Sequence, residues 1–341
     1  MNHSTVKSFT FGIGLFFTLP LVYGNSSSPS SSDGTLYINK SKTHKVAPVK
    51  YGFHYEEIGM MGEGALHAEL IRNRSFEEAT PPAGLSVKNG LYENVPAPRV
   101  KEKKVFQADP LIGWTTYPLS YTPVFISRTD ENPMSGENKY SMLVNVTEDI
   151  ANHSDALILN RGYYGMNLKT DTSYRLSLFL KNRNYSAPLR VFLVDEWGQR
   201  VSNVIEVNVG NRDWTKYTGE LKPEKNVRRG MFAIQPMSKG QFQMDVVSLF
   251  PSDTWNDGKS VFRKDIVQNL KEFSPSFIRF PGGCIVHGVN EETMYHWKKT
   301  LGRLKIVRDS GANGRLITVP TESAIMSFMN CANMWELMRC M

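Results

Sequence analysis

Cysteine is scarce in this 341-residue sequence, which contains only three. An odd number cannot form a disulfide framework, and two of the three, Cys331 and Cys340, lie in an unusual C-terminal stretch. A small disulfide-stapled scaffold is therefore excluded, and Cys284 is the one cysteine left to interpret. The histidines show no metal-ligand spacing, so neither a metal nor another cofactor is expected.

The sequence also lacks blocks of like charge. Although the net charge is +7, Lys and Arg are scattered, and the densest basic run, VKEKKV at 100–105, is short and interrupted by Glu. This patterning argues against a nucleic-acid partner. With 40% hydrophobic residues, the chain can still bury the core of one large domain or of two to three ordinary ones.

The N-terminus has the pattern of a secretory signal peptide over residues 1–24. A charged start ends at Lys7, the apolar stretch 9–23 follows, and Gly24 precedes a polar run. The apolar stretch is shorter than the roughly 20 residues that a membrane-spanning helix needs, so no stable membrane span is expected. Residues 25–45 read as a Ser-rich flexible linker. The sequence thus predicts a secreted or periplasmic protein.

Residues 46–100 and 252–302 both have the pattern of an α/β fold. In the first, the apolar run YGFHY is followed by acidic residues, a Gly-rich loop and ALHAELIRN, which predicts a strand, a loop and a short helix. The second predicts a helix followed by the buried strand FIRF. The predicted apolar face of that helix consists of Phe262, Ile266, Leu270 and Phe273.

Residues 101–251 change to short β segments separated by turn residues. In residues 174–181, YRLSLFLK, Tyr and Leu occupy every second position, which is the period-two pattern of a half-buried strand. Seven or eight such strands predict a β-sandwich. Because this all-β stretch separates two pieces with α/β character, we expect it to be an insertion into a larger domain.

Several phrases carry a resemblance to a known family. They are YGFHYEE, GALHAELIRNRSFE, GYYGMNL, DVVSLFPSDTW, FRKDIVQNLKEFSPSFIRFPGGCIVHG and YHWKKTLG. In this order they resemble the α-L-arabinofuranosidases of glycoside hydrolase family 51 over roughly residues 45–302. The closer resemblance is to the subgroup in which a carbohydrate-binding-type sandwich of jelly-roll form is inserted after the first barrel strand. It implies a retaining glycosidase on a (β/α)8 barrel, of which this chain would hold about two strands.

The resemblance also implies substrate-binding residues. YGFHYEE matches barrel strand one, whose terminal Glu hydrogen-bonds arabinofuranose hydroxyls in the family, and the matching residue here is Glu56. The RxPGG motif of strand two matches Arg279, whose planar donor fork suits sugar oxygens or carboxylates. Cys284 stands where many members have an Asn that contacts the sugar, so that contact is in question.

The residues alone leave other roles open at these positions. Period two points only one of Glu56 and Glu57 into a barrel mouth, and leaves the other as a surface or ion-paired carboxylate. Arg279 in an apolar strand reads as a buried guanidinium that needs a partner, which a structural ion pair would also provide. The histidines read as ordinary polar or packing residues, although His287 lies close enough to the PGG turn to line a cleft.

The two catalytic carboxylates of a retaining glycosidase are missing, so no catalytic residue is assigned. The family places its acid/base Glu in a motif like GNE, which is absent, and its nucleophile at the end of strand seven. Asp195 and Glu196 in VDEWGQR resemble the nucleophile motif, but they fall on a predicted hairpin turn of the sandwich. Four aromatic residues could stack on sugars, with core packing as the alternative. They are Trp114, Tyr163, Tyr164 and Trp197.

The tail, residues 303–341, differs from the rest of the chain. Five of the 15 Met and two of the three Cys lie between Met326 and Met341. Sliding the reading frame by one base lets the residues from Leu304 onward be reread as a helix and a strand that suit the family after WKKTLG. We therefore expect the tail to be an out-of-frame translation product without a function of its own.

These observations predict an α-L-arabinofuranosidase by descent. Its expected partner is an arabinose-containing plant polysaccharide or oligosaccharide, such as arabinan or arabinoxylan. The chain as it stands is expected to be inactive. Two alternatives remain open: a sugar-binding protein that retains only the sandwich, and another barrel glycoside hydrolase such as an endoglucanase.

Overall fold

The computed structural model describes most of the chain between Tyr51 and Arg279. The described residues are 38, 39, 41, 43, 45, 51–56, 60–78, 86–88, 91–93, 105–107, 109–118, 121–136, 138–149, 156–279, 286, 310–312 and 315–317. The chain divides into two compact units, Met1–Pro48 and Val49–Met341, and the helices and strands of the described residues all belong to the second unit. The predicted signal peptide and most of the predicted linker lie outside the described residues.

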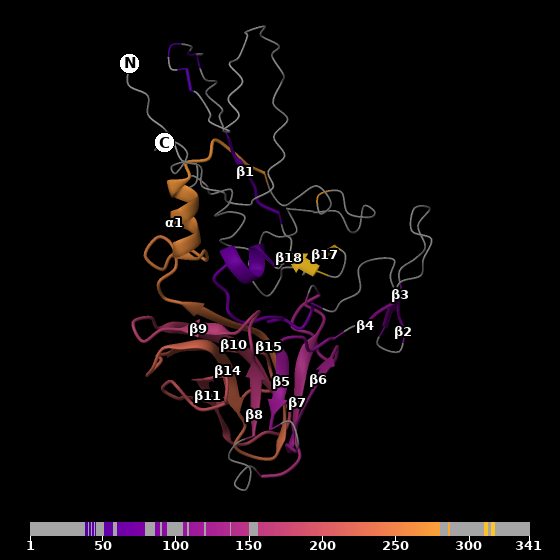
Figure 1. Cartoon of the computed structure of the whole chain (residues 1–341). Helices are drawn as coiled ribbons and strands as arrows, with labels where there is room; N and C mark the ends of the chain where they lie inside the picture. The colour runs from indigo at the N-terminus through magenta and orange to yellow at the C-terminus, as the bar shows by residue number, and fades with distance from the viewer. Residues whose placement is uncertain are drawn as a thin grey trace. The chain divides into compact units, whose positions relative to one another are not determined.

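Two antiparallel β-sheets form the body of the second unit (Figure 1). The first sheet has the strand order β13-β10-β15-β7-β6, and the second has the order β12-β11-β14-β8-β5 with β9 paired to β14. The first sheet consists of β6 (Val124–Thr129), β7 (Ser141–Val146), β10 (Tyr174–Asn182), β13 (Thr215–Leu221) and β15 (Gly240–Pro251). The second consists of β5 (Trp114–Tyr117), β8 (Leu157–Asn160), β9 (Met166–Leu168), β11 (Pro188–Val194), β12 (Ile205–Asn208) and β14 (Val227–Gln235).

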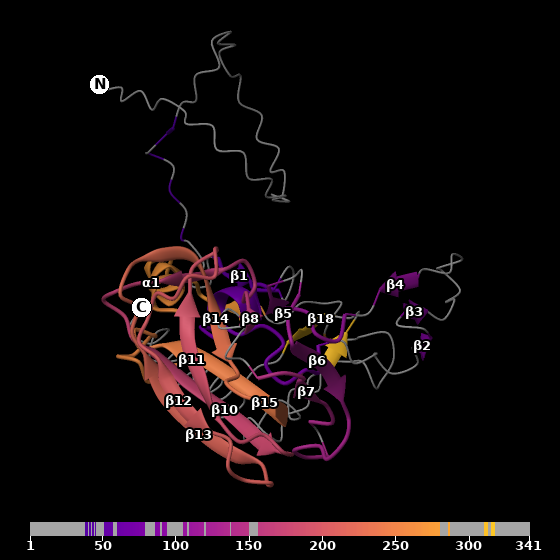
Figure 2. The same cartoon turned by 90° about the horizontal axis from the view of Figure 1, so that it is seen from below.

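The main hydrophobic core lies between these two sheets. In β10 every second side chain from Tyr174 to Leu180 is buried, which confirms the predicted alternation. Phe232 and Ile234 of β14, in the other sheet, belong to the same buried cluster. The two sheets thus share one buried core, and Figure 2 shows their strands from below.

The sheets contain more strands than the sequence predicts. The first has five strands and the second has six, against seven or eight expected in all. The sequence pattern does not predict β6, because two apolar residues stand side by side at its start. Val124 is buried, whereas Phe125 is 57% exposed, so the two faces of the strand do not differ in polarity there. The stretch ALILNRGYYGMNL forms two strands, β8 and β9, with a turn at residues 161–165 between them.

A parallel pair and a short helix lie outside the two sheets. The pair joins β1 (Phe53–His54) to β16 (Ile278–Arg279), and the helix α1 (Lys264–Glu272) comes just before β16. A π-helix, η1 (Gly62–Leu66), follows β1.

The predicted apolar face of α1 is only partly right. Phe262 precedes the helix, because Arg263 has extended backbone and is the N-cap. Val267 is the buried residue of α1, whereas Phe273 is exposed and its ring packs edge-on against Phe53 at 5.4 Å. The helix therefore has a narrower apolar stripe than the sequence pattern indicates.

Two small sheets complete the described residues. One contains β2 (Ser86–Lys88), β3 (Leu91–Glu93) and β4 (Val105–Gln107), and the other contains β17 (Ser310–Ala312) and β18 (Arg315–Ile317). Apart from β17 and β18, the predicted out-of-frame tail lies outside the described residues. The described part of the chain is mostly β and contains no closed barrel. None of its helices is long and apolar enough to cross a membrane.

Candidate functional site

Two parallel strands bring the two predicted sugar-binding residues together. The register pairs His54 of β1 with Arg279 of β16. The amide of Tyr55 donates to the carbonyl oxygen of Arg279 at 2.8 Å, so the pairing continues one residue beyond β1. Glu56 is the next residue. It therefore stands just past the carboxyl end of β1, beside the carboxyl end of β16.

Glycine at position 52 lets the two strands approach. A Cβ atom there would lie 2.4 Å from the carbonyl oxygen of Phe277, which is too close for any real side chain. Just before this contact, the amide of Ser276 donates to the carbonyl oxygen of Tyr51 at 2.8 Å, and the Tyr51 hydroxyl donates to the carbonyl oxygen of Phe273 at 2.6 Å. The YGF order at the start of β1 thus fixes the pairing that positions Glu56.

Glu56 and Arg279 form an ion pair at the end of these strands. Nη1 of Arg279 donates to Oε1 of Glu56 at 3.0 Å, and the Arg279 and Glu56 side chains remain 46% and 40% exposed. The expectation that Arg279 is buried is therefore wrong, because within the described residues β16 pairs only with β1 and the guanidinium lies at the strand end. An exposed pair of this kind contributes at most about 1 kcal/mol to stability. The pair therefore contributes little to the stability of the fold.

Three other predicted positions, Glu57, Cys284 and His287, lie outside the described residues, and their roles stay predictions. Of the remaining candidates, His54 is exposed. His67 is buried with its ring edge-on to a phenylalanine ring at 5.2 Å, as expected for a packing residue. Burial lowers the pKa of His67 well below its ordinary value, so the ring is neutral at pH 7.

Asp195 lies on a hairpin turn, as the sequence predicts. Its carboxylate accepts hydrogen bonds from the amides of Trp197 at 3.0 Å and Gln199 at 2.9 Å, and it pairs with Lys225 at 3.0 Å. Burial alone would raise the pKa of Asp195, but the hydrogen bond from Lys225 and those from the turn amides bring it below its ordinary value. This carboxylate stabilises the turn and has no geometry suited to attack on a sugar.

The four candidate aromatic residues divide into two groups. Trp114 belongs to the core: its ring packs against Phe76 at 5.6 Å, and its Nε1 donates to a backbone carbonyl at 3.1 Å. Tyr163 is half-buried. Tyr164 and Trp197 are 82% and 72% exposed. Only these last two present most of a ring to solvent.

Metal binding finds no support within the part of the chain that the structure describes. No three His, Cys, Asp or Glu side chains converge there in a way that could hold a metal ion. The Glu56–Arg279 pair places a hydrogen-bond acceptor beside a hydrogen-bond donor.

Sequence comparisons match this chain to one group of enzymes. A family profile described as "Alpha-L-arabinofuranosidase 1 domain" matches residues 269–321, which continues past residue 302 into the predicted out-of-frame stretch. Alpha-L-arabinofuranosidase 1 of Arabidopsis thaliana is 26% identical over 257 residues, covering 74% of this chain and 34% of that protein. The extracellular exo-alpha-L-arabinofuranosidase of Streptomyces chartreusis is 26% identical over 265 residues, covering 74% of this chain and 27% of that protein.

A solved structure shares the fold. The arabinose-bound MgGH51 α-L-arabinofuranosidase has a TM-score of 0.67 and 22% sequence identity, covering 86% of this chain and 44% of that one. This chain spans about a third or less of the length of the two curated relatives. In sequence the chain is similar to the α-L-arabinofuranosidases, and it shares its fold with one of them.

Proposed function

We propose that this chain belongs to a secreted, retaining α-L-arabinofuranosidase, and that Glu56 and Arg279 bind the arabinofuranose ring. The observation that carries the proposal is the 3.0 Å pair at the carboxyl ends of β1 and β16. Terminal α-L-arabinofuranosyl groups of arabinan or arabinoxylan are the proposed substrate. The extracellular relative in Streptomyces chartreusis supports export, together with the apolar N-terminal stretch.

The same proposal includes a barrel. In it, β1 and β16 are the first two strands of a (β/α)8 barrel, and the two-sheet body is inserted between them. Their parallel pairing supports this, because parallel neighbours require a crossover connection, commonly one that ends in a helix such as α1. Sites of such barrels lie at the carboxyl ends of the strands, where Glu56 and Arg279 stand.

The division of labour between the two residues follows from their chemistry. A guanidinium has five N–H donors in a rigid fork, so Arg279 can hold Glu56 and donate to a sugar oxygen at the same time. An ionised carboxylate accepts only, so Glu56 suits the hydroxyl groups of the furanose ring. Such bonds select a ring with hydroxyls in the right places and leave bond cleavage to other residues.

Bond cleavage by retention requires two carboxylates about 5–5.5 Å apart. No motif of residues 1–341 supplies either of them, and Asp195 is occupied on its turn. We therefore propose that hydrolysis requires the reading frame that residues 303–341 have lost, and that the 341-residue chain alone is inactive. We also propose that Cys284, which follows β16 in the sequence, contacts the substrate.

The test is hydrolysis of an aryl α-L-arabinofuranoside by a frame-restored protein and its variants. Glu56→Gln and Arg279→Lys should each lower kcat/KM by at least about tenfold, because each removes a charge-assisted hydrogen bond or its geometry. A matched control is Glu131→Gln, which breaks an exposed ion pair with Arg183 on the two-sheet body. Equal rates in Glu56→Gln and in the control would overturn the assignment. Preferential hydrolysis of a β-glucan would instead support the endoglucanase alternative.

A further inference from the structure

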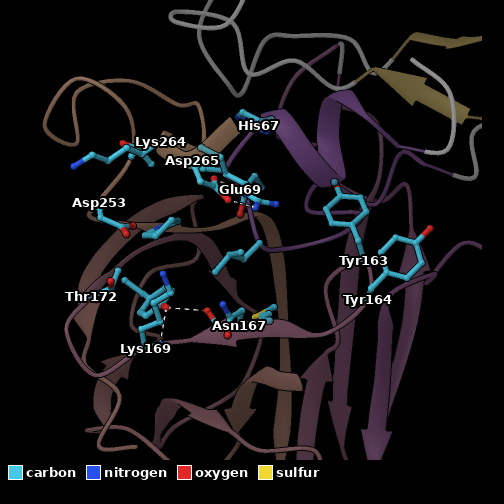
Figure 3. A pocket seen from close by; sticks show the side chains of 18 of the residues that line it. His67, Glu69, Tyr163, Tyr164, Asn167, Lys169, Thr172, Asp253, Lys264 and Asp265 are labelled. Carbon is cyan, nitrogen blue, oxygen red and sulfur yellow. Dashed lines mark hydrogen bonds and ion pairs between the residues drawn. The ribbon is translucent and has the colours of Figure 1, made fainter. Parts of the chain in front are cut away.

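A pocket of about 660 Å³ lies beside the two-sheet body, and neither Glu56 nor Arg279 lines it. It is bounded by the segment Gly64–Leu70, by the turn between β8 and β9, and by the start of α1 (Figure 3). Backbone hydrogen bonds anchor the segment. The amide of Ala68 donates to Val261 O at 2.8 Å, and that of Leu70 donates to Leu249 O at 3.1 Å. These bonds hold the Gly64–Leu70 wall of the pocket against β15 and the residues just before α1.

One side of the pocket is a rigid turn, Gly162–Gly165, with the sequence GYYG. Both glycines have positive φ, +62° and +90°, and a Cβ at position 162 would lie 2.7 Å from the carbonyl oxygen of Leu70. Asn160 ties the turn to the same segment, since its Oδ1 accepts from the Gly162 amide at 2.9 Å and its Nδ2 donates to Arg72 O at 3.0 Å. The sequence between the glycines is held in one conformation.

Two adjacent tyrosines of this turn, Tyr163 and Tyr164, are among the residues that line the pocket, and Figure 3 shows Tyr164 at its outer edge. Tyr163 is half-buried, with its ring against Gly64 and 6.0 Å from the Arg72 guanidinium. Tyr164 is exposed although its backbone is fixed. Because the backbone of the turn is fixed, only the side-chain torsions of Tyr164 have to be ordered when a flat apolar surface stacks on its ring. An exposed aromatic ring on a rigid turn therefore favours ligand contact.

Polar side chains face the tyrosines across the pocket. Asp253 and Lys264 lie on the opposite side in Figure 3, and neither forms an ion pair within the described part of the chain. Thr254 also lines the pocket, with a buried Oγ1 that has no hydrogen-bond partner there. The floor is fixed by Tyr174, whose hydroxyl donates to Asn167 O at 3.1 Å and accepts from a backbone amide at 3.0 Å.

The mixture of groups points to the chemistry of the ligand. An aromatic surface on one side and carboxylate, ammonium and hydroxyl groups on the other match a molecule with an apolar face and many hydroxyls. Both signs of charge are present, so a strongly charged ligand would meet repulsion on one side. We infer that this pocket is a second binding site, and that it takes an uncharged oligosaccharide with one sugar ring stacked on Tyr164.

This site is independent of the proposed hydrolysis at Glu56 and Arg279. The test is calorimetric titration of the full 341-residue chain with xylohexaose and with an arabinan-derived hexasaccharide. Tyr164→Ala should weaken binding by at least about fivefold, because the stacked ring is lost. Asp253→Asn should weaken it less. The matched control is Trp197→Ala, which removes another exposed aromatic ring, one that does not line this pocket.

Separate arms of the experiment distinguish the two sites. A Glu56→Gln, Arg279→Gln double variant should bind the hexasaccharides within about twofold of the parent, whatever becomes of the proposed hydrolysis. Unchanged thermal midpoints would show that Tyr164→Ala is folded, as expected for a side chain that is 82% exposed. The inference is overturned if the folded protein binds neither hexasaccharide, or if Tyr164→Ala binds as tightly as the parent. It is also overturned if the double variant abolishes binding, or if polygalacturonate binds more tightly than either uncharged hexasaccharide.

Discussion

Nη1 of Arg279 donates to Oε1 of Glu56 at 3.0 Å, although the two residues are 223 positions apart in sequence. The two-sheet body lies in the sequence between them. After β1 the chain forms both sheets and then α1. The next strand, β16, pairs with β1 in the register that places His54 opposite Arg279. The pair therefore depends on the pairing of β1 with β16 and not on residues that are neighbours in sequence.

The first prediction concerns what this pair does for stability. Glu56→Gln should change the free energy of unfolding by less than about 1 kcal/mol, since both partners are exposed and solvent screens their attraction. Chemical denaturation of the variant and of the Glu131→Gln control checks this. A loss above about 2 kcal/mol for Glu56→Gln alone would mean that the pair holds the fold rather than serving a ligand.

The second prediction concerns the turn that carries the two tyrosines. Gly162→Ala should destabilise the chain by about 1–3 kcal/mol, because an L-residue is strained at φ +62° and its Cβ would meet the Leu70 carbonyl oxygen at 2.7 Å. Gly210→Ala is the matched control, since nothing lies within 4 Å of a Cβ there. It should be neutral or slightly stabilising. Equal thermal midpoints for the two variants would contradict the strain assigned to the turn.

The third prediction concerns the core between the sheets. Phe232 is fully buried at the centre of β14, so Phe232→Ala should cost about 3–5 kcal/mol through lost burial and the cavity left behind. Phe125→Ala removes the same ring from an exposed position on β6 and should cost less than about 1 kcal/mol. Urea denaturation of both variants measures the difference, and similar midpoints would show that the two sheets do not share a packed core.

The fourth prediction concerns pH. Burial lowers the pKa of His67 in the folded chain well below its ordinary value of 6.5, and neighbouring Arg74 lowers it further. The unfolded chain therefore binds the proton more readily, so the contribution of His67 to stability is present above pH 6.5 and is lost as the pH falls below it. The slope is at most about 1.4 kcal/mol per pH unit. His67→Phe should flatten the stability profile between pH 7 and 5, and a profile as steep as that of the parent would contradict the burial of this ring.

The pH dependence that Asp245 gives to stability has the opposite sign to that of His67. The effect of His67 must therefore be measured by comparing the His67→Phe variant with the parent chain. Burial raises the pKa of Asp245 well above the ordinary value; the Val246 amide lowers it, Glu77 raises it and Arg74 lowers it. A raised folded pKa gives stability that is full below the unfolded pKa of 3.8 and is lost as the pH rises through the folded value. Asp245→Asn should accordingly remove a fall in stability above pH 4, and an unchanged profile would contradict the burial of this carboxyl.

Local patterns in the sequence predict much of the body. The alternation in β10 and the turn after Val194 depend on neighbouring residues, so short windows of sequence contain them. The exposure of Arg279 is not predictable in this way. An apolar strand sequence does not indicate how many other strands or helices pack against the end of that strand. Phe125 shows the same limit, since an apolar residue on the solvent face of β6 breaks the pattern used to find the strand.

The proposed second site is harder still to find from sequence. Its lining comes from four separate stretches, at residues 64–70, 163–174, 251–254 and 263–268, and no spacing rule links them. One local signal exists, the two glycines that flank Tyr163 and Tyr164 in GYYG. Two glycines with positive φ indicate a tight turn, and a tight turn displays the side chains between them.

The fifth prediction concerns the tail. Resequencing the source DNA across codons 295–345 should reveal a single inserted or deleted base, and its correction should open a frame that contains both catalytic carboxylates. The family profile matches the chain as far as residue 321. A frame shift after codon 321 would therefore fit this match better than a shift near codon 303, and the position of the base decides between them. An unaltered sequence with no such frame downstream would leave the tail as a true part of the chain.

The decisive experiment compares hydrolysis of an aryl α-L-arabinofuranoside by the purified 341-residue chain and by the frame-restored protein. We expect no turnover above the uncatalysed rate for the 341-residue chain, and turnover sensitive to Glu56→Gln for the restored protein. Turnover by the 341-residue chain itself would contradict the proposed loss of activity, because the chain would then contain a catalytic pair that neither its motifs nor its described residues reveal.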